Sequence, residues 1–232
     1  ELAKQVSEGF NIIKQNQKPF AFVVKKNTFT PYTLIKNKKV EAELSREQAI
    51  EIVVKNSKKE DIFVSTTGMA SRELYELREK YSLGHEKDFL TVGSMGHASQ
   101  IALAIALNKP SRQIYCIDGD GAFIMQMGGL TSIGSKKVKN FCHIIINNGA
   151  HDSVGGQPTV ALGLDIPSIA LACGYEKAVT VSTREKLENV LKNIEKNLTL
   201  IEIKTTKGSR KDLGRPKESP IENKAVFMEF IK

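Results

Sequence analysis

The chain has no tryptophan, only three cysteines and no long hydrophobic run. A membrane-spanning helix needs about 20 consecutive apolar residues, and the longest candidate, residues 101–107, is far shorter. The cysteines Cys116, Cys142 and Cys173 are odd in number and widely spaced, so a disulfide framework and a zinc ribbon are not expected. These absences predict a cytoplasmic protein with reduced, buried thiols and no membrane association.

The composition is that of an ordinary globular protein. Of 232 residues, 41% are hydrophobic and 26% are charged, which supports a buried core and excludes general disorder. The net charge of +8 suits an anionic substrate or a nucleic acid. No RNA-binding aromatic motif or zinc finger accompanies the charge, so we expect no nucleic-acid partner. A generic nucleotide- or nucleic-acid-binding domain is the alternative that the charge suggests.

Apolar and amphipathic segments alternate from Ser45 onward. The apolar segments predict strands at 61–65, 113–117, 141–146, 177–181 and 199–204. The amphipathic segments predict helices at 45–55, with Ser45 and Gln48 as a capping box, and at 71–81, 122–134, 166–173 and 183–197. Because the strands are apolar throughout, we predict an α/β fold with a doubly wound parallel sheet and helices on both faces.

A second, shorter helix–strand pattern precedes Ser45. Residues 1–15 read as an amphipathic helix, and the apolar run 19–24 reads as a buried strand. The polar stretch that follows contains Pro31 and several lysines, and it indicates a linker.

The sequence Gly119-Asp120-Gly121 directly follows the predicted strand 113–117. Ligands bind at the carboxyl ends of parallel strands, and glycine and a helix N-terminus there favour a phosphate. Asn147 and Asn148 end the next strand, after a helix that rises about 20 Å and a strand that returns about as far. We therefore predict a shared Mg²⁺ held by Asp120, Asn148 and a later carbonyl, with Asn147 as the alternative to Asn148.

Four further stretches carry a resemblance to a known family. They are residues 65–74, 88–99, 147–159 and 208–216. Together with Gly119-Asp120-Gly121 they resemble the thiamine-diphosphate-dependent 2-oxo-acid decarboxylases, in particular those that act on 3-phosphonopyruvate and 3-sulfopyruvate. The resemblance covers residues 45–232 almost continuously, and it implies the diphosphate-binding domain of the thiamine-diphosphate fold.

The resemblance implies roles for residues at matching positions. Asp120, Asn148 and the carbonyl of Ala150 would hold Mg²⁺. Met95 matches an apolar wedge that keeps the cofactor bent, and the Gly93 carbonyl matches an acceptor for the aminopyrimidine. The remaining expected cofactor-binding residues are Thr67, Gly68, Ser94, Gly119, Gly121, Ala122, Ser153 and Val154.

The implied reaction is decarboxylation of 3-phosphonopyruvate to phosphonoacetaldehyde and CO₂, in phosphonate biosynthesis. Arg72 is the first candidate for the substrate anion, with Arg210 and Arg215 as further candidates. His97 and His151 are candidate proton shuttles, although either can instead be a structural histidine. A sulfopyruvate decarboxylase subunit and a non-catalytic thiamine-diphosphate-binding subunit remain alternatives.

The family pairs this domain with a pyrimidine-binding domain that supplies an activating glutamate. We find no such domain in the chain, so we expect it from the same polypeptide or from a partner subunit, within a homo-oligomer. Accordingly, we interpret residues 1–28 as a remnant of a preceding pyrimidine-binding domain and 29–44 as a linker. Residues 45–208 would form the diphosphate- and Mg²⁺-binding domain, and 209–232 a carboxyl-terminal tail.

Overall fold

The computed structural model describes residues 1–32, 35, 40–194 and 197–232, and the chain separates into two units, Glu1–Ile35 and Lys36–Lys232. The predicted linker at 29–44 includes residues 33–34 and 36–39, which lie outside the described residues. Its last residue, Leu44, belongs to the core of the second unit, where its carbonyl accepts a hydrogen bond from the Thr206 amide at 2.9 Å.

The first unit contains helix α1, Leu2–Asn16, as the amphipathic pattern predicts. The predicted buried strand at 19–24 is wrong, because this segment is irregular and Val23 is 93% exposed. A strand needs a neighbour that pairs with its backbone, and no described residue of this unit provides one. Instead Phe20 and Phe22 pack edge to face, 5.0 Å apart, against the helix at Gly9.

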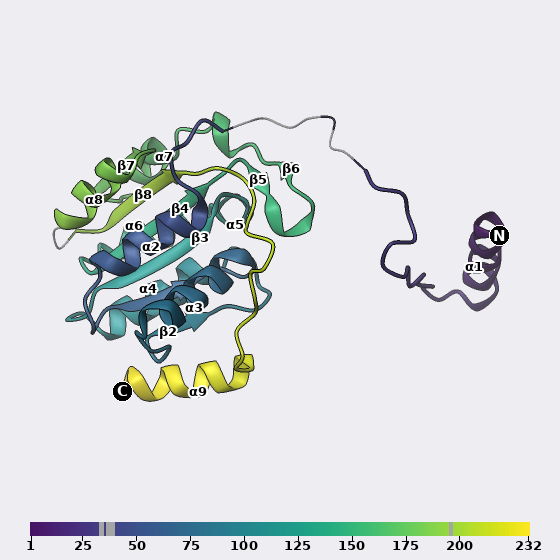
Figure 1. The fold of residues 1–232 in the computed structure, drawn as a ribbon, viewed down its shortest axis with the longest axis horizontal. Helices are drawn as coiled ribbons and strands as arrows, with labels where there is room; N and C mark the ends of the chain where they lie inside the picture. The colour runs from purple at the N-terminus through teal and green to yellow at the C-terminus, as the bar shows by residue number, and fades with distance from the viewer. Residues whose placement is uncertain (33–34, 36–39, 195–196) are drawn as a thin grey trace. The chain divides into compact units, whose positions relative to one another are not determined.

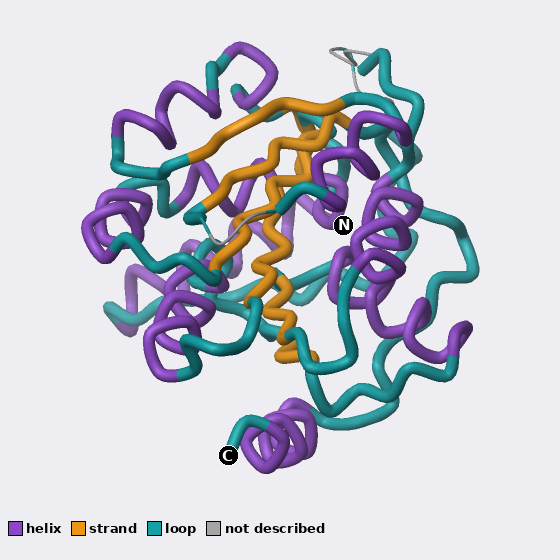
Figure 2. Tube along the Cα trace, turned by 90° about the vertical axis from the view of Figure 1, so that its left-hand side faces the viewer, coloured by secondary structure: helices purple, strands orange, loops and turns teal. Residues whose placement is uncertain are grey.

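The second unit is built on a six-stranded sheet in the order β2-β1-β3-β4-β8-β7 (Figures 1 and 2). Every neighbouring pair in this sheet is parallel. A short antiparallel pair, β5 and β6, lies outside it. The strands are β1 Ile62–Ser65, β2 Asp88–Leu90, β3 Ile114–Gly119, β4 Phe141–Asn147, β5 Ala150–His151, β6 Gln157–Pro158, β7 Lys177–Val181 and β8 Thr199–Lys204.

Helices cover both faces of the sheet, which confirms the predicted doubly wound fold. Successive side chains along each strand point to opposite faces of the sheet, which divides the hydrophobic core into two clusters. In β3, Tyr115 and Ile117 belong to one cluster, and Ile114 and Cys116 belong to the other. The first cluster includes α2 Arg46–Asn56, α3 Met69–Tyr81 and α8 Arg184–Lys192. The second includes α4 Ala98–Asn108, α5 Asp120–Met125, α6 Gly129–Lys136, α7 Ile166–Ala172 and α9 Pro220–Phe230.

Several elements differ from the sequence-based expectation. The predicted helix 122–134 is two helices, α5 and α6, because adjacent Gly128 and Gly129 weaken helix continuity. Strand β2 and helices α4 and α9 were not predicted. The helix predicted at 183–197 ends at Lys192, and residues 195–196 within that prediction lie outside the described residues.

Local capping signals set two helix starts. The Ser45 hydroxyl accepts from the Gln48 amide at 3.2 Å and the Ser45 amide donates to Gln48 at 2.9 Å, so the predicted capping box is confirmed. Ser219 and Glu222 form the same motif at α9, with Pro220 at the first helical position. The tail predicted at 209–232 therefore contains a helix, which is anchored by buried Phe227 against Phe89.

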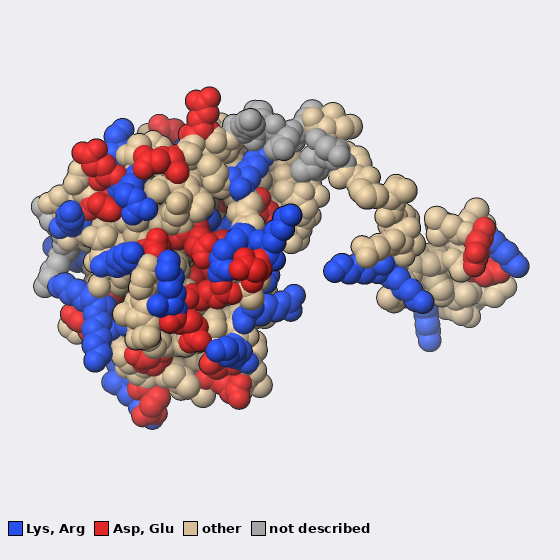
Figure 3. Space-filling model, viewed as in Figure 1, with Lys and Arg blue, Asp and Glu red and all other residues tan. Residues whose placement is uncertain are grey.

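Charges of both signs are interspersed over the face of Lys36–Lys232 drawn in Figure 3, so the net positive charge does not gather into one patch there. Over the part of the chain that the structure describes, no helix combines the length and the apolar character needed to span a membrane.

Candidate functional site

A cavity of about 290 Å³ opens where the carboxyl ends of β1, β3 and β4 meet. Ligand pockets in open parallel sheets lie at this edge. Twelve residues singled out from the sequence line it, namely Thr67, Gly68, Met95, Gly119, Asp120, Gly121, Ala122, Asn148, Ala150, His151, Ser153 and Val154. The tertiary structure thus brings together residues from four separate stretches of the chain.

Asp120 is the first residue of α5, and it is only 3% exposed. Its carboxylate accepts a hydrogen bond from the Thr159 hydroxyl, and it has no ion-pair partner among the described residues. Burial raises the pKa of Asp120, although the Thr159 hydrogen bond opposes this shift. A buried carboxylate without a cationic partner in a polar cavity fits a hard divalent cation such as Mg²⁺.

The two candidate asparagines occupy different environments. The Asn147 side chain is in the core, where it donates to Glu202 at 2.6 Å and accepts from the Gly149 amide at 3.1 Å. Asn148 lines the cavity, donates to Asp152 at 2.7 Å, and accepts from the Ala150 amide at 3.0 Å. An amide oxygen has two lone pairs, so beside the Ala150 hydrogen bond one remains for a cation. Only Asn148 of the pair lies at the cavity.

Gly121 keeps one wall of the cavity free of side-chain atoms. A Cβ atom at this position would lie 2.6 Å from His151 Nδ1 and 3.2 Å from Met95 Cε. The absence of a side chain therefore lets the backbone at the start of α5 approach a ligand closely, as a diphosphate group requires.

The loop before α4 carries Met95 to the cavity through a run of left-handed residues. Gly93, Ser94 and Gly96 have φ values of 71°, 43° and 89°. The Gly93 amide donates to the Thr67 hydroxyl at 3.3 Å, which ties this loop to the end of β1. Gly93 and Ser94, predicted as cofactor-binding residues, are exposed and do not line the cavity, whereas Met95 does.

A buried ionic network in the wall of the cavity was missed by the sequence reasoning. Arg46 is 6% exposed, and its guanidinium donates to both oxygens of Glu73 at 2.7 and 2.9 Å and to Asp152 at 3.1 Å. Asp152 in turn accepts from Asn148, so the network orients a cavity side chain. An arginine directly after an N-cap gives no local signal of burial, because its partners come from other segments.

Arg72, the first candidate for a substrate anion, lies outside this cavity. Its guanidinium donates to the carbonyls of Leu213 and Gly214 in the segment after β8. His97 is exposed and does not line the cavity, while His151 is half-buried and lines it beside Gly121. Of the two candidate proton shuttles, only His151 is therefore at the cavity.

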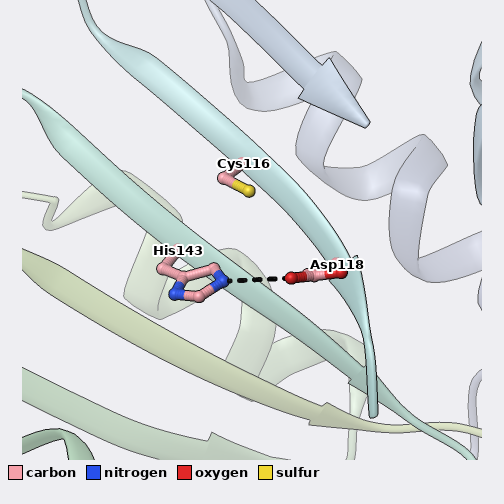
Figure 4. A group of neighbouring side chains, drawn as sticks. All are labelled: Cys116, Asp118 and His143. Atoms are coloured by element: carbon pink, nitrogen blue, oxygen red, sulfur yellow. Dashed lines mark ion pairs between the residues drawn. The ribbon is translucent and has the colours of Figure 1, made fainter. Parts of the chain in front are cut away.

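Side chains of the adjacent strands β3 and β4 form a cluster of Cys116, Asp118 and His143 (Figure 4). His143 Nε2 is 3.6 Å from Asp118 Oδ2, its Nδ1 is 3.0 Å from the Tyr175 hydroxyl, and Asp118 accepts from the Gly119 amide at 3.0 Å. Burial raises the pKa of the Cys116 thiol well above its ordinary value, so the thiolate that a metal needs is disfavoured. Through the hydrogen bond from the Gly119 amide to Asp118, the cluster braces the backbone next to Asp120.

We expect His143→Leu to weaken Mg²⁺-dependent binding of thiamine diphosphate by about tenfold, the lower range for groups that orient metal ligands. The substitution removes the polar imidazole whose Nε2 lies 3.6 Å from Asp118. His143→Gln, which keeps a polar side chain beside Asp118, should recover most of the affinity. Isothermal titration calorimetry of the wild type and the two variants measures the affinity for thiamine diphosphate in the presence of Mg²⁺. Equal affinity in wild type and His143→Leu would show that the brace does not act on the site.

Most of this chain is similar in sequence to known proteins. Residues 65–203 match the family model described as thiamine pyrophosphate enzyme, C-terminal TPP binding domain. Phosphonopyruvate decarboxylase of Streptomyces viridochromogenes is 35% identical over 189 residues, which cover 81% of this chain and 46% of that protein. The chain thus spans about half the length of this relative.

Sulfopyruvate decarboxylase subunit beta of Methanocaldococcus jannaschii is 36% identical over 186 residues, covering 79% of this chain and 95% of that subunit. The crystal structure of benzoylformate decarboxylase from Polynucleobacter necessarius aligns with a TM-score of 0.61 at 19% identity, over 81% of this chain and 38% of that one. The structural similarity, at 19% identity, supports the fold alone. The relationship to the phosphonopyruvate and sulfopyruvate decarboxylases rests on the sequence matches.

Proposed function

This chain belongs to the thiamine pyrophosphate enzymes, as a C-terminal cofactor-binding domain, and from that premise we propose that it takes part in decarboxylating 3-phosphonopyruvate to phosphonoacetaldehyde and CO₂. The observation that carries the proposal is the cavity in which Asp120, Asn148 and Ala150 meet the glycine-lined start of α5. The similarity to phosphonopyruvate decarboxylase supports the choice of substrate.

The residues around the cavity have distinct roles in this proposal. Asp120, Asn148 and the Ala150 carbonyl would hold Mg²⁺, and the backbone at Gly121 and Ser153 would bind the diphosphate. Bound thiamine diphosphate supplies a nucleophilic carbon and accepts the electron pair left by the departing CO₂. Met95 packs against the cofactor as an apolar wedge. His151 Nδ1 lies beside Gly121 and can hold a proton close to the reacting groups.

A pyrimidine-binding domain, from the same polypeptide or from a partner subunit, completes the site in this proposal. It supplies the glutamate that activates the cofactor, and a homo-oligomer accommodates such sharing. We propose a cytoplasmic enzyme that acts on a 2-oxo acid with an anionic group at C3, in phosphonate biosynthesis.

A second candidate is a subunit of a sulfopyruvate decarboxylase. The similarity to the Methanocaldococcus jannaschii beta subunit supports it, with 36% identity over 186 residues. A sulfonate differs from a phosphonate by one charge and a hydroxyl group, so the same cationic pocket can suit either substrate.

The decisive experiment is CO₂ release by the native gene product at its full natural length. The assay contains thiamine diphosphate and Mg²⁺, with 3-phosphonopyruvate, 3-sulfopyruvate and pyruvate in parallel. We expect kcat/KM for 3-phosphonopyruvate to exceed that for pyruvate by about 100-fold or more, since pyruvate leaves the anion pocket unfilled.

The competing outcomes separate the candidates. A preference for 3-sulfopyruvate would replace the first function by the second. Cofactor binding without turnover of any of the three substrates, by a protein with a complete pyrimidine-binding domain, would favour a non-catalytic cofactor-binding subunit.

A further inference from the structure

A second cavity, of about 450 Å³, adjoins the cofactor cavity. The two share Thr67, Gly68, Met69 and Ser153, so a group bound in the second cavity borders the first. Its outer wall comes from the segment that joins β8 to α9, which crosses from the β8 side of the sheet to the β2 edge (Figure 1). The volume lies within the range of small-molecule sites, about 300–1,000 Å³.

Two of the three candidate arginines are held by partners within the chain. Arg72 donates to the carbonyls of Leu213 and Gly214. Arg210 pairs with Glu47 at 3.0 Å and with Asp212 at 3.1 Å, and it also contacts Glu76. Both side chains therefore fix the crossing segment in place and have little capacity left for a ligand.

The segment is held on both sides of Arg215. The Gly214 amide donates to Glu76, and Leu213 is buried. Beyond the segment, Asn223 of α9 donates to the Asp88 carbonyl at 2.9 Å and accepts from the Leu90 amide at 3.1 Å. Pro216 restricts the backbone of the preceding residue to extended conformations. The backbone that carries Arg215 is therefore preorganised.

Arg215 differs from the other two arginines in its side-chain contacts. It lines the second cavity, it is exposed, and within the described residues it has no hydrogen bond or ion pair. The nearby carboxylate that lines the same cavity, Glu218, is hydrogen-bonded to Tyr75. Arg215 thus places a guanidinium group, whose N–H donors have no partner among the described residues, beside the cofactor cavity.

We propose that Arg215, and not Arg72 or Arg210, binds the tetrahedral anionic group at C3 of the substrate. This assignment rests on the proposed function. A guanidinium offers two parallel N–H donors that match two oxygens of a phosphonate or sulfonate. Arg72 and Arg210 act as positioning residues, because they hold the backbone from which Arg215 extends.

The test compares three variants of the full-length protein with cofactor and Mg²⁺. We expect Arg215→Ala to raise KM for 3-phosphonopyruvate by about 100-fold, the effect of losing charge-assisted hydrogen bonds, with thiamine-diphosphate affinity unchanged. Arg215→Lys should recover part of the loss, since it restores charge but not the fork. Lys217→Ala removes a charge from the same segment outside the cavity and should behave as wild type.

Binding of phosphonoacetate, followed by ³¹P NMR, provides a readout that does not depend on turnover, and Arg215→Ala should weaken it by a similar factor. Suppose that the wild type turns over 3-phosphonopyruvate, and that Arg215→Ala has the same KM and the same affinity for phosphonoacetate as the wild type. This result would overturn the assignment of Arg215 but leave the proposed function standing. A wild-type protein that neither turns over 3-phosphonopyruvate nor binds phosphonoacetate would overturn both. If 3-sulfopyruvate is preferred, the same KM effect on that substrate supports the assignment.

Discussion

Replacing Asp120 with alanine should reduce the affinity for Mg²⁺ and thiamine diphosphate by about 100-fold or more, since even the groups that orient metal ligands are worth 10- to 100-fold. Asp120 is 3% exposed, and among the described residues the Thr159 hydroxyl is the one side-chain hydrogen-bond partner of its carboxylate. Because a cation in the cavity gains most from a nearby anionic oxygen in a low dielectric, no other lining residue should have a larger effect on binding.

The same substitution should not destabilise the protein in the absence of ligands. Burial raises the pKa of Asp120 above its unfolded value. When a carboxyl group has a higher pKa in the folded than in the unfolded state, the free energy of unfolding falls as the pH rises from the unfolded pKa to the folded pKa. At neutral pH the ionised carboxylate therefore destabilises the folded protein. Asp120→Ala should therefore leave the ligand-free melting temperature unchanged or raise it.

Differential scanning fluorimetry, with and without Mg²⁺ and thiamine diphosphate, measures both effects. Wild type should show a ligand-induced rise in melting temperature, and Asp120→Ala should not. Asp165→Ala is the control, because Asp165 is an exposed N-cap of α7 and lies outside the cavity lining. Asp165→Ala should show the same ligand-induced rise in melting temperature as the wild type. A normal ligand-induced rise in Asp120→Ala would contradict the site assignment.

Replacing Arg78 with methionine should cost about 3–5 kcal/mol of stability, a large share of a typical total of about 5–15 kcal/mol. Arg78 and Asp88 are both 1% exposed in their side chains and form two hydrogen bonds of 2.8 Å. The guanidinium also stacks 4.7 Å from the Phe63 ring centre. Without Arg78, the Asp88 carboxylate is left buried and unpaired at the edge strand β2.

The cost should depend on pH in a defined direction. Burial raises the pKa of Asp88, opposed in the wild type by Arg78. In the variant this opposition is lost, so the carboxyl group takes up a proton more readily. The deficit in unfolding free energy should therefore be larger at pH 7.5 than at pH 5, where the neutral form is more accessible.

Guanidinium denaturation followed by far-UV circular dichroism suits this chain, which has no tryptophan. Arg78→Met combined with Asp88→Asn should recover part of the loss, because it removes the buried charge as well as its partner. Arg184→Met is the control, since the exposed Arg184 pairs only with Glu188 one helical turn away, and should cost less than about 0.5 kcal/mol. A loss in Arg78→Met as small as in the control would show that the buried pair contributes little.

The strand ends and the residues directly after them were predictable from the sequence. Gly119 ends β3, and Asp120 and Gly121 follow it without interruption, so their position at the carboxyl edge depends only on recognising that strand. The run at 19–24 shows the limit of this approach. Its apolar residues suggest a buried strand, but without a pairing neighbour among the described residues of Glu1–Ile35, Phe20 and Phe22 contact a helix.

Helices α4 and α9 escaped prediction for a related reason. In α4 most positions are small or apolar, so periodicity does not distinguish a buried helix from other buried segments. In α9 the capping box was present in the sequence, but the docking of Phe227 against Phe89 depends on a strand more than one hundred residues away.

The sequence by itself determined the α/β class and the placement of Asp120 and an asparagine at the ends of two consecutive strands. Tertiary structure alone decided that Asn148 lines the cavity, that Arg46 is buried in its wall, and that Arg72 donates to backbone carbonyls. Local conformation and burial follow from neighbours in the chain, whereas a side chain's partners are set by segments that folding brings together. Arg72 and Leu213, 141 residues apart, are the clearest case.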